Sequence, residues 1–454
     1  MAHQPSRPTG RSFPPSPSSL GKGLSVPVNR RSVLGGAMGL SALAALTACG
    51  GGGGGSASVS EGSGAITFGS NQSDAVPKAA YKKIIDGFVK ESGSKVSINT
   101  VDHNTFQEQI NSYLQGDPDD VFSWFSGYRM RFFADQGLAG DISSVWENIG
   151  KNFSESFKAA STGTDGKQYF VPLSYYPWAV FYRKSVFEDK GYEVPKTLDE
   201  MTAVSEDMLK EGLAPIAFGD KDGWPGMGTF DILNMRINGY DYHTKLLAGE
   251  DSWESDQVKE VFNTWTKLLP YHQKGGLGRD WQETAQGLLQ KKSGMYLLGM
   301  FVSQQFQDAE GGDALKDLDF FTFPEINPDF GTDSIDAPID GFMMSAKTQN
   351  GGTAKKLLEY LGSADAEKIN ADADKGLVGP ANDMDTSGYT ALQKKAAKVV
   401  GEAKNIAQFM DRDTRPDFAS TVMIPSIQAF IKNPKDINNI LKDVEAQKKA
   451  IFAG

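Results

Sequence analysis

Strand-like apolar runs alternate with amphipathic helical stripes near the start of this chain. The strand-like runs lie at 65–69, 96–101 and 121–122, and apolar residues recur at helical spacing between them at 81–89 and 106–114. Parallel strands need a crossover connection, and a helix between successive strands is the usual form of that connection. The alternation therefore predicts an α/β protein with a parallel sheet built from βαβ units.

The same alternation continues less regularly toward the C-terminus. Thr197-Leu198-Asp199-Glu200 has the form of a capping box, so we expect a helix from there to Leu209. A final helix is expected after Asn433, because Pro434 costs no hydrogen bond in a first helical turn. The other expected elements are strands at 214–218, 295–298, 318–323 and 337–344 and helices around 228–239, 255–270 and 281–291.

The only cysteine of the chain follows a short apolar run. Leu46-Thr47-Ala48-Cys49 has the small residues that a bacterial lipoprotein signal peptidase requires, and residues 1–48 hold five basic and no acidic side chains. We therefore expect residues 1–48 to be a lipoprotein signal peptide and Cys49 to carry a lipid. Arg30-Arg31 before the apolar run resembles a twin-arginine signal, so ordinary secretion and twin-arginine export both stay open.

The segment after Cys49 is rich in glycine and serine. Residues 49–64 are expected to form a flexible tether, and no second long apolar run follows them. About 400 residues remain after residue 48, and this length indicates two domains or lobes. The sequence thus predicts a protein on the extracellular face of the cell membrane, anchored by its lipid and not by a spanning helix.

Charge and motif content argue against several functions. The net charge of −11 disfavours nucleic acid as a partner. The sequence contains no H-E-x-x-H, G-x-S-x-G, phosphate-binding or dinucleotide-binding motif. His103, His243 and His272 are far apart in sequence, so no metal site, cofactor or catalytic residue is expected.

Aromatic residues stand among polar ones in segments that read as loops. A sugar ring has an apolar C–H face and a rim of hydroxyls, so its binding site needs flat aromatic surfaces and polar side chains around them. Most tryptophans pack in cores, and Trp146, Trp253 and Trp265 in helical stretches are expected to do so. The aromatic residues expected to face a ligand lie beside Gly, Pro or strand ends: Trp124, Tyr176, Trp178, Trp224 and Trp281.

Several segments of the chain carry a combined pattern: 119–138, 166–172 with 178–184, Lys292-Ser293-Gly294-Met295-Tyr296-Leu297 and Asp340-Gly341-Phe342-Met343-Met344. Together they resemble the carbohydrate-binding lipoproteins of ABC importers, the maltose-binding-protein-like extracellular solute-binding family. The resemblance implies a periplasmic-binding-protein fold, with two α/β lobes, a hinge and a ligand cleft between the lobes. The implied lobes are 65–172 with 325–393 and 173–324 with 394–454.

The resemblance also implies a function and a set of binding residues. The protein would capture a mono- or oligosaccharide and deliver it to the permease subunits of an importer, as a monomer on a Gram-positive cell. Trp124 matches the family's stacking tryptophan, while the first loop, Ser70 to Asp74, lacks the aromatic residue of many relatives. The candidate ligand-binding residues are Asn71, His103, Asn104, Trp124, Tyr176, Trp178, Trp224, Trp281, Asp340, Phe342 and Arg412.

Two alternatives from other classes remain open at this point. A lipid-anchored glycoside hydrolase would need two carboxylates facing a sugar, and a chain with 57 acidic residues can always supply such a pair. A receptor for another solute is the second alternative, because Tyr175-Tyr176 resembles the tyrosine pair of ferric-ion binders. No cluster of histidines or carboxylates supports that reading.

Overall fold

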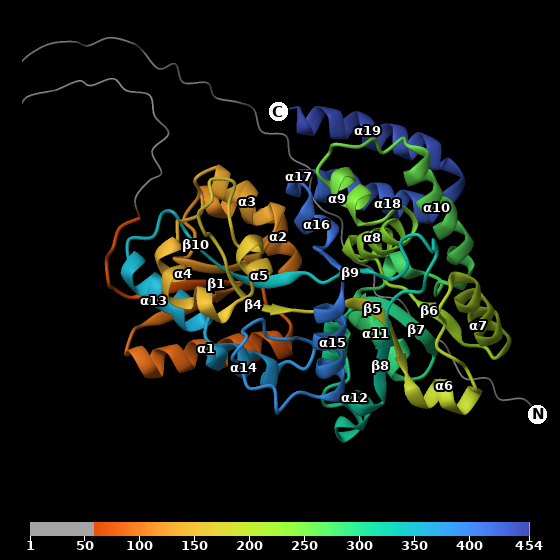
Figure 1. Cartoon of the computed structure of the whole chain (residues 1–454), viewed down its shortest axis with the longest axis horizontal. Helices are drawn as coiled ribbons and strands as arrows, with labels where there is room; N and C mark the ends of the chain where they lie inside the picture. The colour runs from red at the N-terminus through yellow and green to blue at the C-terminus, as the bar shows by residue number, and fades with distance from the viewer. Residues whose placement is uncertain (1–58, 454) are drawn as a thin grey trace, which may run out of the picture. The chain divides into compact units, whose positions relative to one another are not determined.

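The computed structural model describes residues 59–453, so the predicted signal peptide, Cys49 and most of the predicted tether lie outside the described residues. Within 59–453, none of the helices combines the length and the apolar character that crossing a membrane requires. The elements of this part of the chain form two larger mixed sheets, one small sheet and the helices around them (Figure 1).

The first sheet has the strand order β2-β1-β3-β10-β4. Its strands are β1 (Ile66–Ser70), β2 (Val96–Thr100), β3 (Val121–Phe125), β4 (Val171–Tyr175) and β10 (Ile339–Met344). β1 runs parallel to both β2 and β3, as the βαβ pattern predicts, with the crossover helices α1 (Ala75–Ser92) and α2 (His103–Gln115) between them. β10 is antiparallel to β3 and to β4, so the prediction of a parallel sheet was wrong for the part of the sheet that β10 and β4 form.

Helices cover the first sheet, and the central strands are buried from end to end. In Figure 1, α1 and α14 (Ala364–Ala373) lie together along one side of the sheet while α2 and α3 (Tyr128–Asp135) lie on the other. Strands buried on both faces are nearly continuously apolar, which explains why β3 and β10 do not alternate with polar residues. The remaining helices of this region are α4 (Ser143–Ile149), α5 (Glu155–Ala160) and α13 (Gly351–Leu361).

The second sheet has the order β6-β7-β5-β8. Its strands are β5 (Trp178–Arg183), β6 (Ala214–Ala217), β7 (Ser293–Gly299) and β8 (Leu318–Phe321); only β6 and β7 are parallel. The helices of the rest of the chain are α6 (Lys184–Lys190), α7 (Leu198–Lys210), α8 (Trp224–Asn238), α9 (Tyr240–Leu247), α10 (Asp256–Leu268), α11 (Trp281–Leu289), α12 (Asp313–Asp317), α15 (Ala391–Glu402), α16 (Met410–Asp413), α17 (Pro416–Phe418), α18 (Ile424–Lys432) and α19 (Ile437–Phe452).

Two predicted helix starts are confirmed with differences in detail. The Thr197 hydroxyl accepts a hydrogen bond from the Glu200 backbone N–H at 3.2 Å and so caps α7. The Glu200 carboxylate, however, accepts from the Lys196 N–H and not from Thr197, so only one half of the capping box forms. After Asn433 a 3₁₀ turn at Pro434–Asp436 precedes α19.

The chain crosses between the two larger sheets through a two-residue link and through the longer segment 322–338, which contains β9 (Ser334–Asp336). The chain leaves the first sheet at Tyr175 and enters the second at Trp178. It returns through β9, which lies between β8 and β10 in sequence and pairs in parallel with β11 (Asn405–Ala407). These three-residue strands are not predicted by the sequence pattern.

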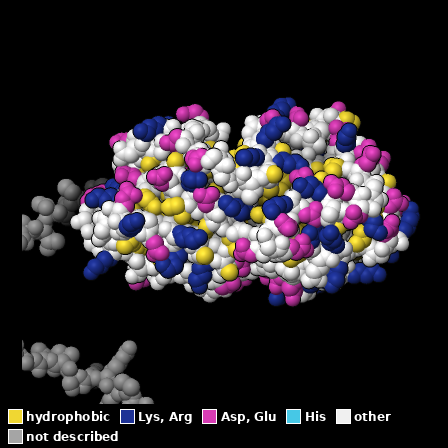
Figure 2. Space-filling view, turned by 90° about the horizontal axis from the view of Figure 1, so that it is seen from below, with side chains coloured by type: hydrophobic (Ala, Val, Ile, Leu, Met, Phe, Trp, Pro, Cys, Tyr) yellow, Lys and Arg dark blue, Asp and Glu magenta, His cyan; other side chains and the backbone are white. Residues whose placement is uncertain are grey.

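Charges of both signs are mixed over the surface. Figure 2 shows Lys and Arg side chains interspersed with Asp and Glu across the face in view, with no large patch of one sign. A nucleic-acid site needs a basic patch or stripe, and this face has none.

Candidate functional site

A cavity of about 140 Å³ is lined by segments from both larger sheets. The first sheet contributes the loop after β1, the start of α2 and the ends of β4 and β10. The second contributes β5, the first residues of α8 and α11, and the 3₁₀ segment η4 (Met300–Gln305) after β7. Residues that are far apart in sequence thus meet at one place.

Aromatic rings form one wall of this cavity. Phe301 makes edge contacts with Tyr176, Trp178, Trp224 and Trp281, at centroid distances of 5.1–6.3 Å. Trp224 and Phe301 are half-buried, whereas Trp178 and Trp281 are buried. Aromatic pairs favour such edge-to-face geometry, so the cluster is a rigid apolar surface against which a ligand can pack.

Arg412 is the centre of the polar part. Its Nη1 donates to the Asp340 carboxylate at 2.8 Å and its Nη2 donates to the Tyr176 hydroxyl at 3.0 Å. Its guanidinium also lies 4.0 Å from the centre of the Phe125 ring. A buried arginine needs such partners, because an unpaired charge in the interior is costly.

Asp340 is placed by an irregularity of the sheet. The register between β10 and β4 shifts between Asp340 and Gly341, and a bulge of this kind re-aims the side chains beside it. Gly341 fits here because an added Cβ would lie 2.0 Å from the Val171 carbonyl oxygen. Burial raises the pKa of Asp340, and the neighbouring Arg412 opposes that rise.

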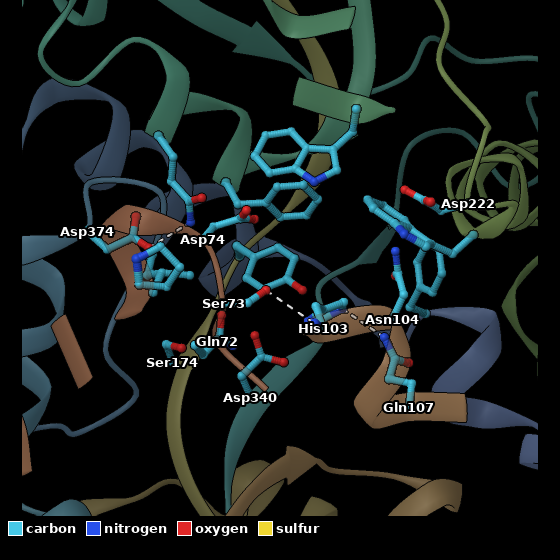
Figure 3. A pocket seen from close by; sticks show the side chains of 18 of the residues that line it. Gln72, Ser73, Asp74, His103, Asn104, Gln107, Ser174, Asp222, Asp340 and Asp374 are labelled. Carbon is cyan, nitrogen blue, oxygen red and sulfur yellow. Dashed lines mark hydrogen bonds between the residues drawn. The ribbon is translucent and has the colours of Figure 1, made fainter. Parts of the chain in front are cut away.

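Further polar groups join the two sides of the cavity. The Gln282 amide of α11 donates to the Asp74 carboxylate before α1, at 3.2 Å. The Gln304 amide of η4 donates to Asp374, after α14, at 2.8 Å (Figure 3). Burial raises the pKa of Asp374 to about 6, although the hydrogen bond from the Gly376 N–H opposes this. These contacts bring both sides of the cavity within hydrogen-bond distance of each other.

Eight of the eleven candidate residues line the cavity. Trp224 and Trp281 each begin a helix, and His103 and Asn104 form the first turn of α2. The residues brought together are His103, Asn104, Tyr176, Trp178, Trp224, Trp281, Asp340 and Arg412.

Three candidates do not line the cavity, so the structure does not bring them together with the other eight. Trp124 is 1% exposed and packs among Phe106, Phe125 and Phe133, because its position on β3 faces the core. Phe342 is fully buried in another aromatic cluster. Asn71 is buried with its side-chain oxygen accepting from the Ser123 hydroxyl.

The structure adds cavity residues that the sequence did not indicate. Phe301 and Gln304 lie on η4, for which no sequence pattern was recognised, and Gln107 lies one turn into α2. Asp74 and Asp102 precede helices, and an acidic residue at that position is the one sequence signal available. Within the described part of the chain, no group of three or more His, Cys, Asp or Glu residues could hold a metal ion.

The two mixed sheets contribute to one cavity lined by aromatic rings and carboxylates, an arrangement suited to binding a small ligand. Residues 72–368 match the model of the bacterial extracellular solute-binding protein family, and the chain belongs to that family. It is therefore a solute receptor and not an enzyme.

Known relatives are similar over most of their length. The solved structure of the bacterial solute receptor AcbH, described as having an exclusive preference for β-D-galactopyranose, is 48% identical, covers 86% of this chain and 100% of its own, and has a TM-score of 0.83. An ABC transporter extracellular-binding protein of Pyrococcus horikoshii is 25% identical over 75% of this chain and 76% of its own. The α-glucosides-binding periplasmic protein AglE of Rhizobium meliloti is 24% identical over 64% of this chain and 67% of its own.

Proposed function

We propose that this chain is the sugar receptor of an ABC importer and that its cavity takes one uncharged sugar of about hexose size. The observation that carries the proposal is the aromatic wall of Trp178, Trp224 and Phe301 in a cavity whose other lining is rich in carboxylates. Aromatic rings contact the apolar C–H face of a pyranose, and carboxylates accept hydrogen bonds from its hydroxyls. The preference of AcbH for β-D-galactopyranose supports a single pyranose ring.

The volume supports a small sugar. At roughly 10–15 Å³ for each water-sized group, a cavity of about 140 Å³ holds about ten such groups. A hexose has about a dozen non-hydrogen atoms, so one ring fills this space and a longer oligosaccharide exceeds it.

The charges support an uncharged sugar. Arg412 is the one Lys or Arg side chain among the cavity residues, and it is already paired with Asp340. A sugar phosphate or a sugar acid would meet several carboxylates without a free cation, which disfavours its binding. The aspartates that line the cavity are Asp74, Asp102, Asp222, Asp340, Asp374 and Asp411.

We further propose two lobes that close on the sugar, 65–172 with 325–393 and 173–324 with 394–454. The strands of the two larger sheets divide in the same way, except that β4 continues in the first sheet to Tyr175. The connections at 176–177 and through β9 would then act as the hinge, because both cross between the proposed lobes.

The proposal includes attachment to the membrane through a lipid on Cys49, on the outer face of a Gram-positive cell, with the receptor acting as a monomer. Its motivation is the Leu46-to-Cys49 motif and the glycine-rich segment after it. Replacing Cys49 by Ala should abolish labelling by a radioactive or clickable fatty acid. Equal lipid labelling of both proteins would refute the anchoring.

A thermal-shift screen tests the sugar proposal. The panel contains D-galactose, D-glucose, a disaccharide, a trisaccharide, galacturonate and galactose 6-phosphate. A sugar at 100 times its Kd stabilises the folded state by about 2.7 kcal/mol, which gives a clear rise in melting temperature. We expect a rise with a neutral monosaccharide and none with the two anionic sugars; a rise only with an anionic sugar would refute the proposed ligand class.

A further inference from the structure

Gln107 on α2 lies between two nitrogen-bearing side chains. Its Oε1 accepts a hydrogen bond from Nη1 of Arg129 at 2.6 Å, and its Nε2 lies 2.8 Å from Nε2 of His103, one helical turn earlier (Figure 3). An amide oxygen can only accept, an amide nitrogen can only donate, and a guanidinium has donors only. Arg129 therefore fixes which end of the Gln107 amide faces His103.

This orientation determines the protonation of His103. Since the Gln107 nitrogen must donate, Nε2 of His103 must accept, and the ring is then neutral with its hydrogen on Nδ1. The backbone of Asn71 lies within hydrogen-bond reach of the ring and can receive that hydrogen. Both ring nitrogens are thus occupied by the protein.

Several contacts also fix the position of the Arg129 guanidinium. It is 3% exposed, its Nη1 also lies 3.3 Å from an Asp411 oxygen, and its guanidinium is 5.0 Å from the Trp124 ring centre and 5.7 Å from that of Phe125. The buried Trp124 thus forms part of the surface on which this arginine rests. Arg129 itself does not line the cavity.

The charged groups around His103 are consistent with a neutral ring. Burial is the main cause that lowers the pKa of His103, and Arg412 acts in the same direction. Asp411 and Asp74 act against it, and Asp102 at the start of α2 also interacts with the ring.

We propose that Arg129 is a positioning residue that makes Gln107 a hydrogen-bond donor and locks His103 in its neutral Nδ1–H form. Gln107 keeps a second amide hydrogen, which can be donated to a hydroxyl oxygen of the sugar. The facing carboxylates then accept from the sugar hydroxyls, so the cavity offers a donor on this wall and acceptors elsewhere. The part that concerns sugar rests on the function proposed above, whereas the state of the imidazole does not.

Long-range ¹H–¹⁵N NMR of the imidazoles tests the lock without any ligand. We expect the His103 signal, assigned by its loss in His103→Gln, to show the Nδ1–H tautomer and no titration between about pH 5.5 and 8. In Gln107→Glu a carboxylate replaces the donor, so the ring should take up a second proton and titrate within that range. An Nε2–H tautomer in the unmodified protein, or unchanged behaviour in Gln107→Glu, would overturn the proposal.

Variants of Arg129 test the positioning role. Arg129→Met should allow the Gln107 amide to turn, mix the His103 tautomers and weaken calorimetric binding of D-galactose about tenfold. Arg131→Met on the same helix is the matched control, since Arg131 acts on the Asp413 carboxylate whereas the Gln107 oxygen accepts from Arg129, and it should change neither quantity. Arg129→Lys is the conservative variant: its ammonium group can only donate, so it should keep the orientation of the Gln107 amide and a single Nδ1–H tautomer of His103.

The outcomes separate the two proposals. If the His103 tautomers mix in Arg129→Met but neither the unmodified protein nor any variant binds sugar, the proposed role of Arg129 is supported and the proposed sugar function is refuted. A folded Arg129→Met with a single Nδ1–H tautomer and unchanged affinity would refute the lock.

Discussion

Replacing Arg412 by Met removes the cation on which the polar part of the cavity depends. The Arg412 and Asp340 side chains are only 7% and 11% exposed, and 2.8 Å separates the bonded nitrogen and oxygen. Removing one partner of a buried ion pair costs about 3–5 kcal/mol, because the other charge stays buried without compensation. We therefore expect the free energy of unfolding to fall by about that amount at pH 7.

The loss should depend on pH in a defined direction. Burial already raises the pKa of Asp340, and Arg412 is the main opposing influence, so the variant raises this pKa further. A carboxyl group whose pKa is higher in the folded state lowers the free energy of unfolding as the pH rises from its unfolded-state pKa, about 3.9, toward its folded-state pKa. The destabilisation should therefore be largest at neutral pH and smallest near pH 4.

Urea denaturation at pH 7 and at pH 4.5 measures both effects. Asp340→Asn and the double variant complete a mutant cycle, in which we expect a coupling energy of about 1–3 kcal/mol at pH 7. Unfolding free energies equal to wild type at pH 7, or an equal loss at both pH values, would refute the reasoning about this pair.

Three further changes separate binding from folding. Trp224→Ala should weaken sugar binding about thirtyfold by calorimetry. Trp124→Ala removes a fully buried ring and should lower the free energy of unfolding by about 3–5 kcal/mol. Equal melting temperatures of the two variants would contradict the placement of Trp224 in the cavity and Trp124 in the core. Asp336 is buried with no hydrogen-bond partner for its carboxylate among the described residues, and burial raises its pKa. Asp336→Asn should therefore remove part of the loss of stability that begins as the pH rises above about 4, measured by pH-dependent melts. In Gly376→Ala the new Cβ would lie 2.8 Å from the Phe301 Cα, so that ring must shift and calorimetry should show weaker binding; an unchanged Kd would contradict this close approach.

Local periodicity was enough to predict the elements whose own residues define them. β1, α1, β2 and α2 were predicted because each is long enough to show a pattern, and the structure confirms them; β3 was predicted over its first two residues only. β9 and β11 have three residues each, too few to show a period. The direction of β10 was not predictable from its sequence, because it depends on a path that first builds the second sheet.

The site was predictable where a local signal marks a surface position. Trp224 and Trp281 stand at helix starts beside Gly, Pro or Asp, and both line the cavity. Trp124 and Trp178 each stand on a strand in an apolar segment, yet one faces the core and the other the cavity. Which face of a strand is covered depends on helices distant in sequence, so that difference appears only in three dimensions. Phe301 was missed for a different reason: it lies on the short 3₁₀ segment η4, for which no sequence pattern was recognised.

Calorimetric titration of the purified protein with D-galactose and the same panel of sugars, with recovery of the sugar, is the most direct test of the proposed receptor. A receptor with one cavity for an uncharged sugar should bind a neutral monosaccharide saturably with a stoichiometry near one, and the sugar should be recovered unchanged. No measurable binding of any neutral sugar, or conversion of the sugar by the protein, would contradict that function.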